Sequence, residues 1–391
     1  MKREQQPMGT VFGDALPGAP ALAGRGRVTV GFREVEWSHA DQLDVGRGKV
    51  NGAWQTYTRT LRVAVWYPAI DAGEDYACLT DHMGRVDLGN LKPFTMASRS
   101  LLGAEADTAS GKHPVVVISH GYPGSRMLLS NLAENLSSKG YIVIAPGHTD
   151  NTYEDFLKER SMESAMVHRT LDQRFVIDKL WELESEGFLR GMLDLDRIAL
   201  VGFSMGGFGA LRTLGAKMCQ DMVERLGDLG YAVTEPAWQG DSRVKAAVLF
   251  APATMWFDEC AVSDITAPTL WICGTADRTV HYDKVRAFAE KCTRSDRVFV
   301  SYIGCGHNVA NNPAPVCAQS ESWEIYKRWG DSVWDTWKLN NLNAHFMTAF
   351  LDARLLSGDG MQYLTECDEK ARRGFLEGTD AGVMIDLWNR A

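Results

Sequence analysis

The chain of 391 residues is 45% hydrophobic and 23% charged, and its formal net charge is −9. This balance is typical of a globular protein. The excess of acidic groups argues against nucleic acid as a partner, because nucleic-acid binding depends on neutralising phosphates with Lys and Arg. Since no run of five basic residues and no stretch of 18 apolar residues occurs, we expect neither nucleic acid nor a membrane as a partner.

The eight cysteines are scattered without the Cys-x-x-Cys or Cys/His spacing of a metal site, so we predict no metal. Their even number leaves disulfides open. The first twenty residues contain no continuous apolar segment of the signal-peptide type, and we therefore expect a cytoplasmic protein. Nothing in the sequence indicates an oligomeric state.

The first third of the chain has three compositionally different parts. Residues 1–25 are rich in Gly, Pro and Ala, which predicts a flexible N-terminal arm before a single domain over 26–391. Alternating apolar residues predict strands over 27–37 and 60–67. Residues 70–112 are polar and irregular, and we expect a surface excursion there.

From residue 114 onward, short apolar segments alternate with helical patterns. Near-continuous apolar strands are typical of a parallel sheet covered on both faces, and strand–helix alternation is typical of a doubly wound α/β fold. The segments predict strands over 114–119, 141–145, 197–202, 244–250, 268–273 and 297–303, and helices over 127–139, 161–186, 205–217, 283–292 and 322–355. We therefore predict a mostly parallel sheet of about eight strands.

Two stretches are longer than a simple crossover requires. Residues 151–190 contain a long polar helical segment, and residues 218–243 separate a predicted helix from the next strand. Each is predicted to be either a lid over a site or surface decoration, and both readings stay open. A C-terminal helical extension is expected after the last strand.

The strongest functional signal is Gly202-Phe203-Ser204-Met205-Gly206-Gly207. It follows a predicted strand and precedes a predicted helix, which is the context that G-x-S-x-G requires for a nucleophile elbow. The glycines allow the strand and helix backbones to approach closely, and the helix amino end favours developing negative charge. We predict that Ser204 is a nucleophile, the alternative being a chance Gly/Ser turn.

A serine hydroxyl is a weak nucleophile and needs a base. His307 and Asp277 each follow a later predicted strand, and the order Ser, Asp, His is that of the α/β-hydrolases. We predict that His307 takes the proton of Ser204 and that Asp277 orients the imidazole. Asp258, which follows an earlier strand, is the rival acid.

Acyl transfer also needs hydrogen-bond donors for a tetrahedral oxyanion. We predict the main-chain N–H groups of Met205, directly after the nucleophile, and of Tyr122, in the loop after residues 114–119. Gly121 would let that loop approach the serine. His120 is expected to brace the loop rather than to act as a base.

Several further residues are candidates with ordinary alternatives. Trp256 and Phe257 are candidates for an acyl or leaving-group pocket, although aromatic residues near a loop more often serve packing. His148 and Asp150 resemble a metal pair, but no third ligand is evident.

Together these residues resemble the dienelactone-hydrolase-like and platelet-activating-factor-acetylhydrolase-like branch of the α/β-hydrolases, over roughly residues 27–355. The matching segments are RVAVWYP (62–68), SHGYPGSR (119–126), LDRIALVGFSMGG (195–207), 268–277 and 304–307. The resemblance implies hydrolysis of carboxylic esters, lactones or amides without a cofactor. Dienelactone hydrolases carry Cys at the position of Ser204, and relatives commonly carry His at that of Phe203, so the substrate stays open.

We therefore predict a serine esterase that cleaves a small-molecule ester through an acyl-enzyme on Ser204. One alternative is an acyltransferase, in which an alcohol or amine intercepts the acyl-enzyme. Another is a non-catalytic binding protein that keeps the hydrolase fold.

Overall fold

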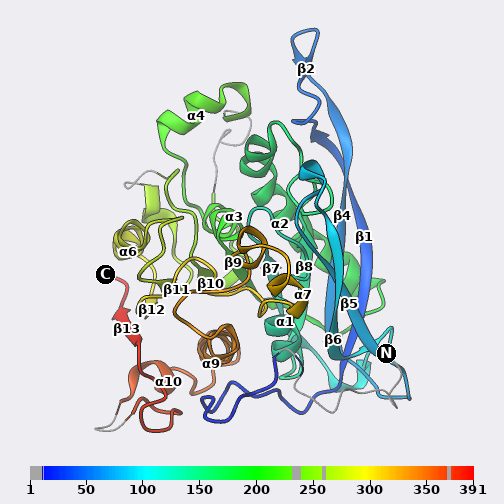
Figure 1. The fold of residues 1–391 in the computed structure, drawn as a ribbon. Helices are drawn as coiled ribbons and strands as arrows, with labels where there is room; N and C mark the ends of the chain where they lie inside the picture. Colours follow the sequence, from blue (N-terminus) through cyan, green and yellow to red (C-terminus); the bar gives the residue numbers. More distant parts are fainter. Residues whose placement is uncertain (1–10, 12, 231–238, 258–260, 368–370) are drawn as a thin grey trace.

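The computed structural model describes residues 11, 13–230, 239–257, 261–367 and 371–391. In this part of the chain, eleven strands form one sheet with the order β13-β12-β11-β10-β9-β7-β8-β4-β1-β6-β5 (Figure 1). The strands of this sheet are β1 (Val30–Leu43), β4 (Thr56–Pro68), β5 (Tyr76–Met83), β6 (Lys92–Leu102), β7 (His113–Ser119), β8 (Ile142–Gly147), β9 (Leu193–Phe203), β10 (Val244–Phe250), β11 (Thr269–Gly274), β12 (Arg297–Tyr302) and β13 (Val383–Trp388). A separate two-stranded hairpin consists of β2 (Lys49–Val50) and β3 (Ala53–Trp54).

Helices pack on the sheet in two pairs, α1 with α9 and α2 with α3. All side chains of β7 from Pro114 to Ser119 are buried, so both faces of the sheet are covered there. The described helices are α1 (Ser130–Ser137), α2 (Ser161–Ser185), α3 (Met205–Thr213), α4 (Gln220–Leu226), α6 (Tyr282–Lys291), α7 (Val316–Gln319), α8 (Trp323–Tyr326), α9 (Thr336–Leu355) and α10 (Gln362–Thr365). None of them is both long enough and apolar enough to cross a bilayer.

The run β8-β7-β9-β10-β11-β12 is parallel throughout. The carboxyl ends of parallel strands lie at one edge of a sheet, where α/β proteins place their functional loops. The loops after β7, β9, β11 and β12 all leave from this edge. The α/β fold predicted from the sequence is confirmed, and each of the eight predicted strands is present.

Besides the short hairpin of β2 and β3, three strands of the large sheet were not predicted. The expectation of an irregular surface excursion over 70–112 is wrong, because β5 and β6 form an antiparallel pair there. Strand β6 joins the sheet beside β1, where Gly31 pairs with Leu101. The third is β13, which pairs antiparallel with β12, so the expected C-terminal helical extension ends in a strand.

The segment expected to be a loose arm is packed against the domain over its described residues. The main-chain N–H of Leu16 donates to Asn341 Oδ1 at 2.9 Å, and Ala23 is completely buried. Arg25 forms ion pairs with Asp14 and Glu134.

The long stretch 151–190 consists mostly of α2. Buried residues occur along most of this helix, and it packs against α3. It is therefore a crossover helix of the sheet. In the second stretch, 218–243, the structure describes α4 and its surroundings, while residues 231–238 lie outside the described part.

The seven cysteines of the described part are free thiols. Cys260 lies outside it.

Candidate active site

Ser204 lies at the sharp turn between β9 and α3 with a φ of +53°. A non-glycine residue rarely adopts this conformation, and such strain persists only where surrounding contacts enforce it. The main-chain N–H of Ser204 donates to Phe250 O at 2.9 Å, and its carbonyl oxygen accepts from the N–H of Ala253 at 3.0 Å. The neighbouring strand β10 and its loop therefore hold the turn.

The two elbow glycines are required by close packing. A Cβ on Gly202 would lie 2.5 Å from the carbonyl oxygen of Gly206. A Cβ on Gly206 would lie 2.0 Å from the carbonyl oxygen of Ser119 at the end of β7. Any side chain at either position would displace main chain, so the elbow needs glycine at both.

The structure brings the three predicted triad residues together. His307 Nε2 lies 3.0 Å from Ser204 Oγ, and His307 Nδ1 lies 2.7 Å from Asp277 Oδ2. The other carboxylate oxygen of Asp277 accepts the main-chain N–H groups of Thr279 at 2.8 Å and Val280 at 3.2 Å. This arrangement can remove a proton from the serine hydroxyl and stabilise the resulting imidazolium.

The side chain of Asp277 is fully buried. Burial by itself raises the pKa of a carboxyl group, but the hydrogen bond and charge of His307 and two main-chain donors reverse this, and the pKa of Asp277 lies below its ordinary value. The group is therefore ionised at neutral pH. The rival acid, Asp258, lies outside the described residues.

The loop after β7 lies directly beside the nucleophile. A Cβ on Gly121 would lie 3.0 Å from ring carbons of Phe203 and 3.6 Å from Cβ of Ser204. The ring of Phe203 in turn lies 5.2 Å from the imidazole of His307. The main-chain N–H groups of Tyr122 and Met205, the two predicted oxyanion donors, therefore belong to segments that adjoin the serine.

His120 braces this loop through both ring nitrogens. Its Nε2 accepts the main-chain N–H of His148 at 2.9 Å, and its Nδ1 donates to Gly121 O at 2.7 Å. Burial, with the nearby charge of Arg169, holds the pKa of His120 well below its ordinary value. A neutral imidazole with two main-chain partners has no free nitrogen with which to act as a base.

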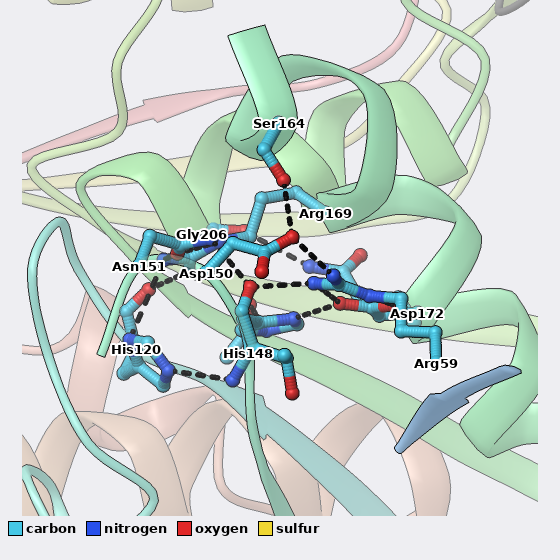
Figure 2. A network of polar contacts seen from close by, with 12 residues as sticks. Arg59, His120, His148, Asp150, Asn151, Ser164, Arg169, Asp172 and Gly206 are labelled. Carbon is cyan, nitrogen blue, oxygen red and sulfur yellow. Dashed lines mark hydrogen bonds and ion pairs between the residues drawn. The ribbon is translucent and has the colours of Figure 1, made fainter. Parts of the chain in front are cut away.

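His148 and Asp150 face different partners. His148 Nδ1 lies 2.9 Å from Asp172 Oδ2, and its Nε2 lies 2.8 Å from Ser119 Oγ. Asp150 instead forms an ion pair with Arg59, which also binds Asp172 (Figure 2). The two residues thus belong to a buried charge network rather than to a metal pair.

The two aromatic candidates separate in the structure. Trp256 is half-buried and forms a wall of a hollow of about 350 Å³, together with side chains from α2 and α4. Phe257 is buried and stacks on Phe208 with ring centroids 5.1 Å apart. Helix α2, which lines this hollow, also contacts the loop at residues 120 and 121. Trp256 packs edge-on against Phe208 of α3, with ring centroids 5.5 Å apart.

Three residues that contact the site from α2 and the loop after β8 were not predicted from the sequence. Arg169 donates to the carbonyl oxygens of His120 and Gly121, and to Asn151. Gln173, one turn further along α2, donates to Gly206 O at 3.1 Å. No motif marks these residues, because in the sequence they look like ordinary members of a polar helix and a polar loop.

Comparisons with known proteins find similarity to serine hydrolases. A family model described as platelet-activating factor acetylhydrolase, isoform II, matches residues 95–165, and one described as serine hydrolase (FSH1) matches residues 195–314. Two cutinases of Thermobifida alba, est1 and est2, are each 27% identical to this chain over 157 residues. These residues make up 40% of this chain and 40% or 39% of the cutinases, so the match spans about two fifths of either protein.

A solved structure supports the same fold over nearly the whole length. The ferulic acid esterase of Streptomyces cinnamoneus superposes with a TM-score of 0.63 at 19% sequence identity, covering 94% of this chain and 99% of the esterase. With an elbow serine at the end of β9 and the histidine and aspartate beyond β12 and β11, the chain has the α/β-hydrolase fold.

Proposed function

We propose that this protein is a serine esterase that hydrolyses a carboxylic ester of a small molecule. The observation that carries the proposal is the continuous chain of contacts from Ser204 Oγ through His307 to the buried carboxylate of Asp277. Cutinases and a ferulic acid esterase among the similar proteins support an ester as the substrate.

The reaction has two steps. His307 Nε2 accepts the proton of Ser204 as the serine oxygen attacks the ester carbonyl, and the N–H groups of Tyr122 and Met205 stabilise the oxyanion. His307 then protonates the departing alcohol, which leaves an acyl group on Ser204. Water, deprotonated by His307, attacks this acyl-enzyme and releases the acid. Since side chains and main-chain groups supply every proton transfer and charge, the proposed reaction needs no cofactor.

We take the hollow beside Trp256 as the subsite for the acyl or alcohol group. Five of its seven lining residues are apolar, and three of these are methionine, a flexible side chain that adapts to different shapes. Glu163 and Arg225 are its charged members, and its other lining residues are Met162, Met166, Met222, Leu226 and Trp256. Esters with an apolar chain are therefore expected to be better substrates than acetyl esters.

A cytoplasmic location remains a prediction from the sequence.

The test compares the wild-type protein with Ser204→Ala on p-nitrophenyl esters of increasing chain length. We expect the variant to lose at least a thousandfold in kcat, as in other triads, while its thermal unfolding stays close to wild type. A fluorophosphonate should label the wild type and not the variant. Undiminished hydrolysis by Ser204→Ala, or absence of labelling in the folded wild type, would refute the proposal.

A further inference from the structure

The guanidinium of Arg169 is completely buried and is directed at the loop after β7 (Figure 2). Its Nη1 donates to His120 O, and its Nη2 donates to Gly121 O at 2.7 Å. Its Nε donates to Asn151 Oδ1 at 3.1 Å. A single side chain of α2 thus holds two consecutive carbonyl groups of the segment that carries Tyr122.

This cation has an unusual environment. Among the described residues, no carboxylate oxygen lies within ion-pair distance of Arg169, although Asp172 is nearby on the same helix. A buried charge without a carboxylate partner is costly unless its hydrogen bonds are fully used. Burial lowers the pKa of Arg169 to about 9, so the group still carries its charge at neutral pH. All of that charge is directed at main-chain carbonyls and one amide.

The contact with Gly121 determines the direction of the proposed oxyanion donor. The peptide group between Gly121 and Tyr122 is trans, and in a trans peptide the C=O and the N–H point in opposite directions. With the carbonyl oxygen held toward Arg169, the N–H of Tyr122 is turned away from α2. The carbonyl also accepts the Nδ1–H of His120 at 2.7 Å, so its orientation is fixed by two donors.

The same contact strengthens the donor electrostatically. A cation that donates a hydrogen bond to a carbonyl oxygen polarises the whole amide group. Hydrogen bonds in such a series reinforce one another in a low-dielectric interior. The Tyr122 N–H therefore carries more positive charge than an unassisted amide. This effect matters most when an oxyanion forms, because preorganised dipoles act on charge that develops in the transition state.

The other proposed donor is supported from the same face of α2. Gln173 follows Arg169 by one helical turn, and residues four apart lie on the same helix face. Gln173 Nε2 donates to Gly206 O at 3.1 Å, within the elbow that carries Met205. One rigid helix face thus holds both segments that supply donors.

We infer that Arg169 is a positioning residue that orients and polarises the Tyr122 N–H for oxyanion binding. This inference rests on the proposed esterase function, since without an oxyanion the orientation of that N–H has no catalytic meaning. Lysine at this position would keep a positive charge but, with a compact ammonium in place of the planar fork, could not hold both carbonyls and Asn151.

The experiment measures how strongly the enzyme prefers an oxygen ester over its thionoester, in which sulfur replaces the carbonyl oxygen. Sulfur accepts hydrogen bonds weakly, so a functioning oxyanion site favours the oxygen ester. For Arg169→Lys we expect kcat on the oxygen ester to fall by about 10- to 100-fold, which is less than the loss on removing an oxyanion donor outright. The KM should change less than about threefold. The thionoester rate should change less than about threefold, so the preference collapses.

A matched control is available in Arg297. This arginine is also buried and also donates to two main-chain carbonyl oxygens, of Glu290 and Asn389, at the far edge of the sheet. Arg297→Lys should lower thermal stability without changing the oxygen-to-thiono preference. Asn151→Ala is the second test variant, because it removes a neutral hydrogen-bond partner of Arg169. The preference of this variant for the oxygen ester over the thionoester should be about three- to tenfold weaker than that of the wild type.

The outcomes separate this inference from the proposed function. Hydrolysis that survives Ser204→Ala would refute the esterase proposal itself. If hydrolysis depends on Ser204 but folded Arg169→Lys prefers the oxygen ester over the thionoester as strongly as the wild type does, only the role of Arg169 is overturned. If Arg169→Lys does not fold, Asn151→Ala decides, and an unchanged preference in that variant overturns the inference.

Discussion

Asp277 Oδ2 lies 2.7 Å from His307 Nδ1, and this contact holds the imidazole with Nε2 facing Ser204. An asparagine there could donate its amide N–H to Nδ1 of His307. The ring proton would then lie on Nε2, which could no longer accept the proton of Ser204. Asp277→Asn should therefore reduce kcat by about 10³- to 10⁴-fold with little change in KM, measured on a p-nitrophenyl ester. Asp258→Asn is the control for the rival acid and should stay within about twofold of wild type. A reversed pattern would reassign the acid to Asp258.

Trp256 is expected to govern substrate size. Trp256→Ala enlarges the hollow and removes apolar contact worth about 1.5–3 kcal/mol, so kcat/KM should fall at least about tenfold for a long acyl chain and much less for an acetyl ester. Phe257→Leu is the comparison, because this side chain packs against Phe208 and Phe288. It should cost about 1 kcal/mol of unfolding free energy and leave chain-length preference unchanged. Equal losses on all chain lengths would contradict the role of Trp256.

Gly206→Ala should disrupt both stability and activity. The added methyl group would lie 2.0 Å from Ser119 O and 2.8 Å from His120 O, which are main-chain atoms that cannot move independently. Overpacking of this kind costs about 1–3 kcal/mol or more, and it also shifts the loop that carries Tyr122. Gly24→Ala is the matched control, because nothing lies within 4 Å of the added Cβ. Thermal unfolding should separate the two variants, and equal melting temperatures would contradict the described packing.

His345 should make the protein less stable in acid. Burial, with the nearby charge of Lys139, lowers the pKa of His345 to about 3, against about 6.5 in an unfolded chain. Between pH 6.5 and 3 the unfolded state therefore binds a proton that the folded state does not, and the free energy of unfolding falls as the pH falls.

The measurement compares wild type with His345→Gln, which has no titrating group. The wild type should lose about 1.4 kcal/mol per pH unit relative to the variant between pH 6 and 4, as followed by urea unfolding. The folded His345 accepts the main-chain N–H of Leu22 at 3.2 Å, so the variant itself has a constant cost at all pH values. Parallel pH profiles would show that His345 titrates alike in both states.

The sequence predicted the strands of the parallel core because each is a short apolar run with both faces covered. Strands β5 and β6 escaped this reasoning for a physical reason. In β5, buried and more exposed positions alternate, and one buried position is Asp81, which accepts from Ser125 Oγ at 2.8 Å. An inward-facing carboxylate interrupts the apolar alternation, so the segment has the composition of a loop.

The triad followed from order and spacing, since each member ends a recognisable strand. Arg169 could not be found in this way. Its partners are the carbonyl oxygens of residues 120 and 121, and a main-chain acceptor leaves no mark on the sequence. Helix α2 also buries several polar and charged side chains, so it lacks the apolar stripe that distinguishes a core helix from a surface one.

Strand β13 is the outermost neighbour of β12, pairing from Arg297 with Trp388 to Tyr302 with Val383. A chain cut before residue 383 would leave β12 with unpaired N–H and C=O groups along an open side, which is a template for pairing with another molecule. During synthesis the same open side persists until residues 383–388 have emerged. Loss of β13 would thus replace a partly exposed edge strand with β12, whose side chains are all buried in the intact sheet, and we expect the shortened chain to aggregate even though every catalytic side chain is still encoded.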